Sequence, residues 1–174
     1  EAPWVDLLGN DTLHLDTFNA VGSLAALDIK RLAISSQHVV VDGRASVHGL
    51  PSLANAMVSL DCNNLMLTTS PWLKIAKTAS IKLPAFCERI PLIGISGHVD
   101  GSIRDLAMNA SVNTKFGKAN IAASMTWDQD SPPTYSGSLA TSSFNLGSLL
   151  QNQKLGGIQF DLEVDGYGFQ NSDR

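Results

Sequence analysis

The stretch that decides the fold is LAMNASVNTKF, at residues 106–116. Its apolar side chains share one parity, at Leu106, Met108, Ala110, Val112 and Phe116, and most positions between them are polar. Successive side chains of a β-strand point to opposite faces, so this alternation predicts a strand with one apolar and one wet face. A sheet made of such strands has a broad apolar face, and the question of function is where that face goes.

The same alternation recurs along most of the chain. It predicts further strands, which cover 13–16, 29–35, 39–48, 56–63, 79–83, 93–100, 119–127, 135–139 and 158–165. Residues 65–69 are expected to continue the strand at 56–63 past a break at Asn63-Asn64.

Two short helices are expected between these strands. Ser70-Pro71 resembles a helix N-cap with proline at the first helical position, and two turns that include Trp72 follow it. Asn145 is a second candidate cap, ahead of residues 146–150. The stretch 128–134 has the composition of a loop.

A short repeat indicates how the strands are organised. The tripeptide Val-Asp-Gly occurs at 41–43, 99–101 and 164–166, and each copy ends or interrupts a strand whose apolar parity includes the valine. This shared parity suggests degenerate β-hairpin units laid side by side. Glycine inside such strands permits the bulge or bend that curves a sheet. We therefore expect residues 1–174 to form one segment of curved sheet.

The composition excludes several classes of function. Charged residues make up 16% of the chain, against about 25% in a typical soluble domain, and the mean hydropathy is slightly positive. The net charge of −4 provides no basic surface for nucleic acid or anionic headgroups. No run of about 18 apolar residues is present that would span a bilayer as a helix. The sequence begins at Glu1 without a signal peptide and stops at Arg174 just after a strand, so we expect an internal segment of a longer protein.

Two cysteines are too few for a disulfide scaffold. A single bridge between Cys62 and Cys87 in an oxidising compartment and two free, buried thiols are both compatible with the sequence.

The sequence motifs of enzymes are incomplete in this chain. Gly94-Ile95-Ser96-Gly97 resembles a nucleophile elbow, but His98 stands where the motif needs its last glycine. Gly166-Tyr167-Gly168 has the first two glycines of a dinucleotide fingerprint, but Asn171 replaces the third. No pair of histidines has a metal-ligand spacing. We therefore expect no catalytic residues, no metal site and no cofactor.

Two arrangements can accommodate the apolar face. In a closed sandwich or barrel, the apolar side chains pack against each other. In a curved sheet that stays partly open, they line a trough. Three features favour the trough: the low charge, the small number of aromatic residues, and the presence of small or flexible apolar residues on the apolar parity. These small or flexible residues are Ala45, Ala56, Met108, Ala110, Ala119 and Met125. Such a trough suits acyl chains, because each buried methylene contributes roughly 0.8 kcal/mol without directional demands.

The second half of the chain resembles a known family. The motifs that carry the resemblance follow in order: Gly97-His98-Val99-Asp100-Gly101, Asp105-Leu106, Thr114-Lys115-Phe116-Gly117, Tyr135-Ser136-Gly137-Ser138-Leu139, Phe144-Asn145-Leu146-Gly147-Ser148-Leu149-Leu150, Leu155-Gly156 and Val164-Asp165-Gly166-Tyr167-Gly168. They resemble the periplasmic β-repeat region of the translocation and assembly module subunit TamB, in the AsmA-like superfamily, especially its form in Bacteroidetes-type bacteria. The resemblance covers 93–169 and is looser over 1–92. The membrane anchor and the C-terminal conserved domain of that family lie outside the segment.

The resemblance implies a fold, a compartment and a function. The fold would be mostly β: a curved antiparallel sheet that forms a half-pipe or taco-like groove with a hydrophobic interior. The whole protein would be anchored in the inner membrane and cross the periplasm. It would act in outer-membrane biogenesis as a lipid-transfer bridge that carries phospholipid between the inner and outer membranes. The alternative is a chaperone-like scaffold that assembles outer-membrane proteins with an Omp85-type partner. The family supplies no catalytic residues.

The alternation names the side chains that we expect to line the groove and to contact phospholipid acyl chains. They are Val41, Val47, Val58, Leu60, Ile95, Val99, Met108, Val112, Phe116, Ile121, Met125, Leu139, Phe160, Leu162 and Val164.

Two other functions require different surfaces. In the scaffold alternative, unpaired terminal strands would bind unfolded strands by β-augmentation. A closed β-sandwich adhesin or carbohydrate-binding module would need aromatic residues clustered on one polar face. The candidates for such a cluster do not share a parity; they are Trp4, Trp72, Trp127, Tyr135 and Tyr167.

Overall fold

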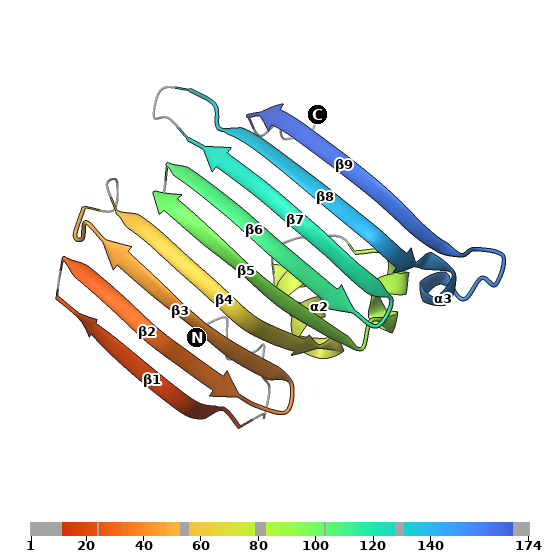
Figure 1. Cartoon of the computed structure of the whole chain (residues 1–174), viewed down its shortest axis with the longest axis horizontal. Coiled ribbons are helices and arrows are strands. Elements are labelled where there is room, and N and C mark those ends of the chain that lie inside the picture. The colour runs from red at the N-terminus through yellow and green to blue at the C-terminus, as the bar shows by residue number, and fades with distance from the viewer. Residues whose placement is uncertain are drawn as a thin grey trace.

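The computed structural model describes residues 12–23, 25–52, 56–78, 83–102, 104–127 and 131–168. Within these ranges a single antiparallel sheet of nine strands follows the order of the chain from β1 to β9 (Figure 1). The strands are β1 (His14–Gly22), β2 (Ala26–Ser35), β3 (Val39–His48), β4 (Met57–Thr68), β5 (Leu92–Ser102), β6 (Asp105–Thr114), β7 (Gly117–Thr126), β8 (Thr134–Asn145) and β9 (Gly157–Tyr167).

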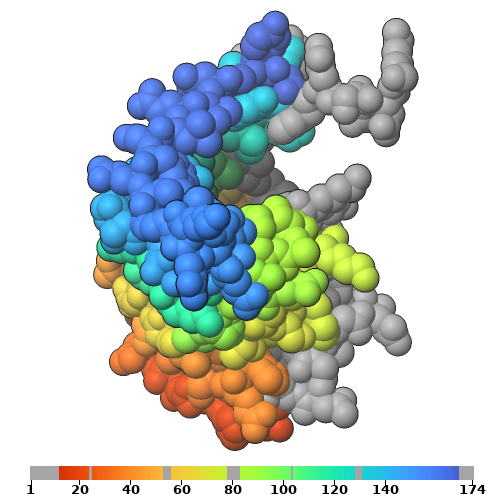
Figure 2. All heavy atoms as spheres, turned by 90° about the vertical axis from the view of Figure 1, so that its right-hand side faces the viewer, coloured from red at the N-terminus to blue at the C-terminus, as the bar shows by residue number. Residues whose placement is uncertain are grey.

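The sheet is curved and open. Seen from one end, the strands follow an arc from β1 to β9 that is hollowed on one side (Figure 2). Strands β1 and β9 are the two edges and do not pair with each other. In the described residues the fold is therefore mostly β, a curved antiparallel sheet with two short α-helices, as the sequence predicts. The closed sandwich and the closed barrel are wrong for this chain.

The helical elements lie at one end of the concave side. Helix α2 (Thr69–Thr78) and the short 3₁₀ helix η2 (Ala85–Arg89) connect β4 to β5, and α3 (Leu146–Leu150) connects β8 to β9. Figure 1 shows α2 behind the sheet at the end where α3 also lies, and Figure 2 shows α2 and α3 at the near end of the arc.

Local hydrogen bonds explain where these helices form. The Thr69 hydroxyl donates to the Ile90 carbonyl at 2.9 Å, and the Trp72 indole N–H donates to the same carbonyl at 3.4 Å. Both bonds hold α2 against the segment that enters β5. At α3 the predicted cap is confirmed, because the Asn145 side-chain oxygen accepts a hydrogen bond from the Ser148 amide at 2.9 Å.

Most of the buried apolar side chains gather at the same end, with Ala33 and Ala56 as the exceptions. Leu67, Trp72, Ala76, Phe116 and Leu149 are each at most 8% exposed. The guanidinium of Arg89 donates to the Leu149 carbonyl at 3.1 Å and so joins η2 to α3. The packed core is thus concentrated beneath the helices.

The rest of the concave face is only partly buried. Leu60, Phe160, Leu162 and Val164 keep between 38% and 51% of their surface exposed. These side chains line the arc without filling it, which distinguishes this sheet from one half of a sandwich.

Bulges account for most differences between the expected and the observed strands. The break at Asn63-Asn64 is a register shift between Cys62 and Leu65, and β4 continues through it to Thr68. A shift between Leu15 and Thr17 moves the apolar parity of β1, so β1 runs beyond the expected Asp16 to Gly22. The expected strand at 79–83 falls largely outside the described residues, and Leu83 is not in a strand.

Candidate functional site

The predicted lining residues form rows across the sheet. Leu60 on β4 pairs with Val99 on β5, which pairs with Met108 on β6. Ile121 on β7 pairs with Leu139 on β8. Directly paired residues project from the same face of a sheet, so these side chains lie side by side on one surface.

The same pairings place the other strand residues on that surface. They are Val41, Val47, Val58, Ile95, Val112, Met125, Phe160, Leu162 and Val164. We call this surface the apolar face; it is the concave one. It runs from β1, where Phe18 pairs with Leu32, to Leu162 on β9.

Phe116 is the exception among the predicted lining residues. It lies in the two-residue turn between β6 and β7, not on a strand, and is 7% exposed. The Lys115 ammonium lies 4.9 Å from the centre of its ring. The strand ends at Thr114 because Phe116 starts the reversal into Gly117, which has a φ of +148° that favours glycine. Phe116 belongs to the packed end of the molecule.

A cavity of about 280 Å³ lies in the apolar face over β2 to β6. It brings together five predicted residues, namely Val41, Leu60, Ile95, Val99 and Met108. It also includes Ala45 and Ala110, which the sequence places among the small residues of the trough. The residues that the sequence reasoning missed are Ile29, Leu32, Gly43, Cys62, Leu65 and Gly97. Leu65 was missed because of the bulge after Cys62. In β4 the apolar face holds even-numbered residues before the bulge and odd-numbered residues after it.

The convex face carries the charges, and over β2 to β5 they are paired. Arg44 Nε lies 2.6 Å from Asp61 Oδ2, and His98 Nδ1 lies 2.5 Å from Asp61 Oδ1. His98 Nε2 lies 3.0 Å from Asp100 Oδ1.

A second group of charges lies one row away. Arg31 Nη2 contacts Asp42 Oδ2 at 3.0 Å, and the Asn63 amide donates to Asp42 Oδ1 at 3.0 Å. The hydrogen bonds from Asn63 and Arg31 lower the pKa of Asp42, and those from Arg44 and His98 lower the pKa of Asp61. These pairs join β2, β3, β4 and β5 on the convex face.

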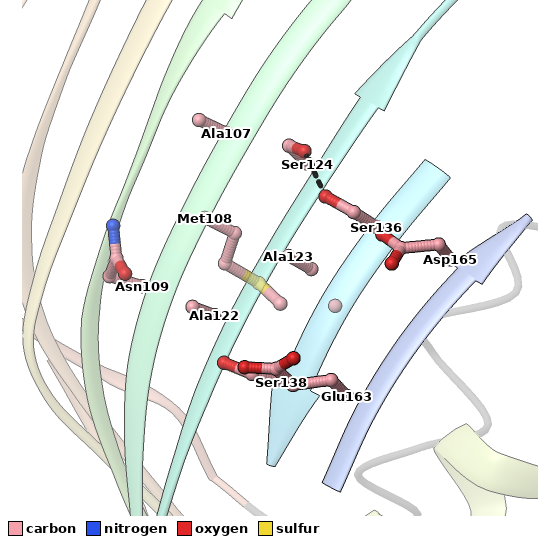
Figure 3. A pocket seen from close by; sticks show the side chains of 11 residues that line it. Ala107, Met108, Asn109, Ala122, Ala123, Ser124, Ser136, Ser138, Glu163 and Asp165 are labelled. Carbon is pink, nitrogen blue, oxygen red and sulfur yellow. Dashed lines mark hydrogen bonds between the residues drawn. The ribbon is translucent and has the colours of Figure 1, made fainter. Parts of the chain in front are cut away.

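A shallow polar hollow of about 380 Å³ lies over β6 to β9 (Figure 3). Ser124 and Ser136 are hydrogen-bonded at 2.8 Å beside it, and Glu163 and Asp165 reach over it from β9. The residues of β7 and β8 that line the hollow are all alanine, serine or glycine, and the two longer acidic side chains border it on β9. Within the described residues, no group of three or more acidic, histidine or cysteine side chains could hold a metal ion.

The two cysteines lie in different surroundings and are both free. Cys62 lines the cavity, and its thiol points toward the Ile95 carbonyl at 3.8 Å. Cys87 lies in η2. Burial raises the pKa of both thiols.

Fold and site together define a curved, open β-sheet with a continuous apolar trough. No protein-family model matches the chain, and neither the curated proteins nor the solved structures that were searched provide a match. Among the described residues, no helix is both long and apolar enough to cross a membrane.

Proposed function

We propose that this chain is part of a periplasmic lipid-transfer bridge, in which phospholipid acyl chains lie on the apolar face. The observation that carries the proposal is the segregation of the two faces. Apolar rows cross the sheet on the concave side, and the ion pairs of Asp42 and Asp61 lie on the convex side. A one-sided apolar surface of this extent needs an apolar occupant.

The chemistry of the trough suits passive movement of lipid. Burial of acyl chains contributes roughly 0.8 kcal/mol per methylene, and aliphatic side chains impose no preferred position along the chain. Polar headgroups would stay at the wet rim of the sheet, because burying them without partners costs several kcal/mol. The trough itself therefore requires no catalytic group.

The wider setting of the proposal comes from the resemblance to TamB. It comprises an inner-membrane anchor outside this segment, a position in the periplasm and an Omp85-type partner in the outer membrane. Transport would then run between the two membranes.

Native mass spectrometry of the purified 174-residue chain tests lipid binding. We expect phospholipid adducts that disappear in Met108→Lys, which puts a charge on the apolar face. The matched control is Asn109→Lys, one position along β6 on the convex face, which should keep its lipid. A chain that binds no phospholipid under any condition, or two variants that behave alike, would contradict the proposal.

The scaffold alternative is supported by the edge strands. Within the described residues, β1 and β9 each have one unpaired side. The Gly168 amide donates to the Pro133 carbonyl on the β8 side, and amide directions alternate along a strand, so Glu163 points its N–H away from β8. Such an edge can accept an added strand.

Proline tests this alternative without breaking the sheet. Glu163→Pro removes an outward N–H, whereas Glu163→Gln removes only the charge. If outer-membrane protein assembly fails with Glu163→Pro but proceeds with Glu163→Gln and with Met108→Lys, the scaffold is favoured over the bridge.

A further inference from the structure

The floor of the cavity in the apolar face is a row of small residues. Gly43 on β3 pairs with Cys62 on β4, Cys62 pairs with Gly97 on β5, and Gly97 pairs with Ala110 on β6. We call this set the small-residue row. Adjacent strands lie about 4.8 Å apart, so the row extends over roughly 14 Å.

The two glycines in this row are places where the strands approach too closely for a side chain. A Cβ atom at Gly43 would lie 2.5 Å from the Asp61 carbonyl oxygen, and one at Gly97 would lie 2.5 Å from the Asn109 carbonyl oxygen. The hollow is therefore built into the backbone and is not a gap that a side chain could close by changing its rotamer.

Larger side chains flank the small-residue row on both sides. Val41, Leu65 and Ile95 form one wall, since they pair in succession. Leu60, Val99 and Met108 form the other. The result is a slot one residue row wide, with aliphatic walls.

Charged groups directly behind the row hold these strands in place. Arg44, Asp61 and His98 are chain neighbours of Gly43, Cys62 and Gly97, and their ion pairs join β3, β4 and β5 on the convex face. The strands that form the floor of the cavity are thus held together by ion pairs. The apolar residues toward β9 are more exposed.

We infer that the small-residue row is a fixed seat for one unbranched acyl chain, so that the trough holds lipid at a defined place as well as letting it slide. This inference rests on the proposed function and adds a location and a ligand shape to it. The side chains of Arg44, Asp61 and His98 project to the convex face, so the slot offers no ionic partner and little hydrogen bonding for a headgroup or a peptide. Its two aliphatic walls run parallel to the row, so an unbranched chain that lies along the row contacts both of them.

The two native thiols provide the first test, because one lies in the row and the other outside it. Dodecanoic acid serves as the single-chain probe and cholesterol hemisuccinate as the fused-ring probe. The rate of N-ethylmaleimide alkylation is followed separately at Cys62 and Cys87 by peptide mass spectrometry. With dodecanoic acid, Cys62 should react roughly tenfold more slowly when about nine seats in ten are occupied, since only the empty fraction reacts. Cys87 should keep its rate, and cholesterol hemisuccinate should protect neither thiol.

A matched pair of substitutions provides the second test. Ala110→Phe fills the row, whereas Ala123→Phe makes the same change on the apolar face outside the cavity, where Ala123 pairs with Met108. We expect Ala110→Phe to abolish protection of Cys62 and Ala123→Phe to retain it, with thermal unfolding as the check on folding. Ala110→Leu serves if the phenylalanine variant does not fold.

The outcomes separate this inference from the function on which it rests. If phospholipid binds but protection of Cys62 is absent, equals that of Cys87 or survives Ala110→Phe, the seat is wrong and the trough remains. If neither phospholipid nor dodecanoic acid binds at all, both proposals fail.

Discussion

His98 and Asp61 face each other on neighbouring strands, with His98 Nδ1 2.5 Å from Asp61 Oδ1. Arg44 approaches the other carboxylate oxygen at 2.6 Å, so Asp61 connects three strands. This contact lies on the convex face, immediately behind Cys62 in the floor of the cavity. The shape of the trough and the charge pairing on its back therefore depend on the same short segment of β4.

The pairing of Asp61 predicts how stability changes with pH. Hydrogen bonds from Arg44 and His98 lower the pKa of Asp61 below its ordinary value of 3.8. A carboxyl group with a lowered pKa stabilises the fold fully above its unfolded-state pKa, and that stabilisation is lost as the pH falls through the folded-state value. Asp61→Asn should therefore lower the melting temperature at pH 7, and the difference from the wild type should shrink in acid below about pH 4.

Asp165→Asn is the control for the Asp61 experiment. Asp165 lies on the convex face of β9 and forms none of the described ion pairs. Its substitution should leave the melting temperature nearly unchanged across the same pH range. Equal effects of the two substitutions would mean that the pairing of Asp61 does not stabilise the sheet.

Charges on the apolar face should block lipid passage. Met125→Lys or Val112→Asp puts a charged group where acyl chains would slide. Most of the fold should remain intact, because Met125 and Val112 are only half-buried. Ser124→Lys and Asn113→Asp are matched controls on the convex face. Phospholipid transfer between donor and acceptor vesicles should fall only in the first pair, and normal transfer by Met125→Lys would refute the sliding mechanism.

The helical end should contribute much of the stability of the molecule. Trp72 is 8% exposed and is hydrogen-bonded to the Ile90 carbonyl. Trp72→Ala should cost about 3 kcal/mol in the free energy of unfolding, because it empties a packed site. Trp72→Phe, which keeps most of the packing, should cost much less in urea denaturation. If the two variants are equally unstable, packing around Trp72 is not the source of the stability of the helical end.

The cap of α3 makes a smaller, separable contribution. Asn145→Ala removes the acceptor for the Ser148 amide and should cost about 1 kcal/mol. Asn145→Asp keeps an acceptor at the same position and should restore most of that loss. Chemical denaturation of the three proteins measures both differences. An alanine variant as stable as the wild type would show that the cap contributes nothing.

Local pattern was enough to predict most of the fold. The alternation in β6 is unbroken, since every residue from Asp105 to Thr114 pairs with β7 without a register shift. Most strands are joined by short connections, which favour pairing between sequential neighbours. The connection from β4 to β5 is longer and contains α2 and η2, but it also joins neighbouring strands. A bulge lies between Leu15 and Thr17. Because it shifts the alternation, the predicted strand ends earlier than the observed one.

The cavity could be predicted only in part. Val99 and Met108 follow from parity, but the small-residue row requires knowledge of which residues pair across strands. Gly43 and Gly97 have no side chain, so the alternation of apolar and polar residues does not identify them as lining residues. The ion pairs of Asp61 also depend on how β3, β4 and β5 are aligned, and the sequence of one strand does not determine that alignment. The prediction that Phe116 lines the groove is wrong, because the alternation of the sequence continues beyond Thr114, where β6 ends and the chain turns.

Photo-crosslinking on both faces of the sheet tests the central claim most directly. A benzophenone amino acid is placed at Leu60 and at its convex neighbour Ser59, and likewise at Leu139 and Ser138. Each protein is irradiated with alkyne-labelled phospholipid. The account predicts labelled adducts at Leu60 and Leu139 and background at Ser59 and Ser138. Equal labelling of the two faces, or no labelling at Leu60 and Leu139, would contradict it.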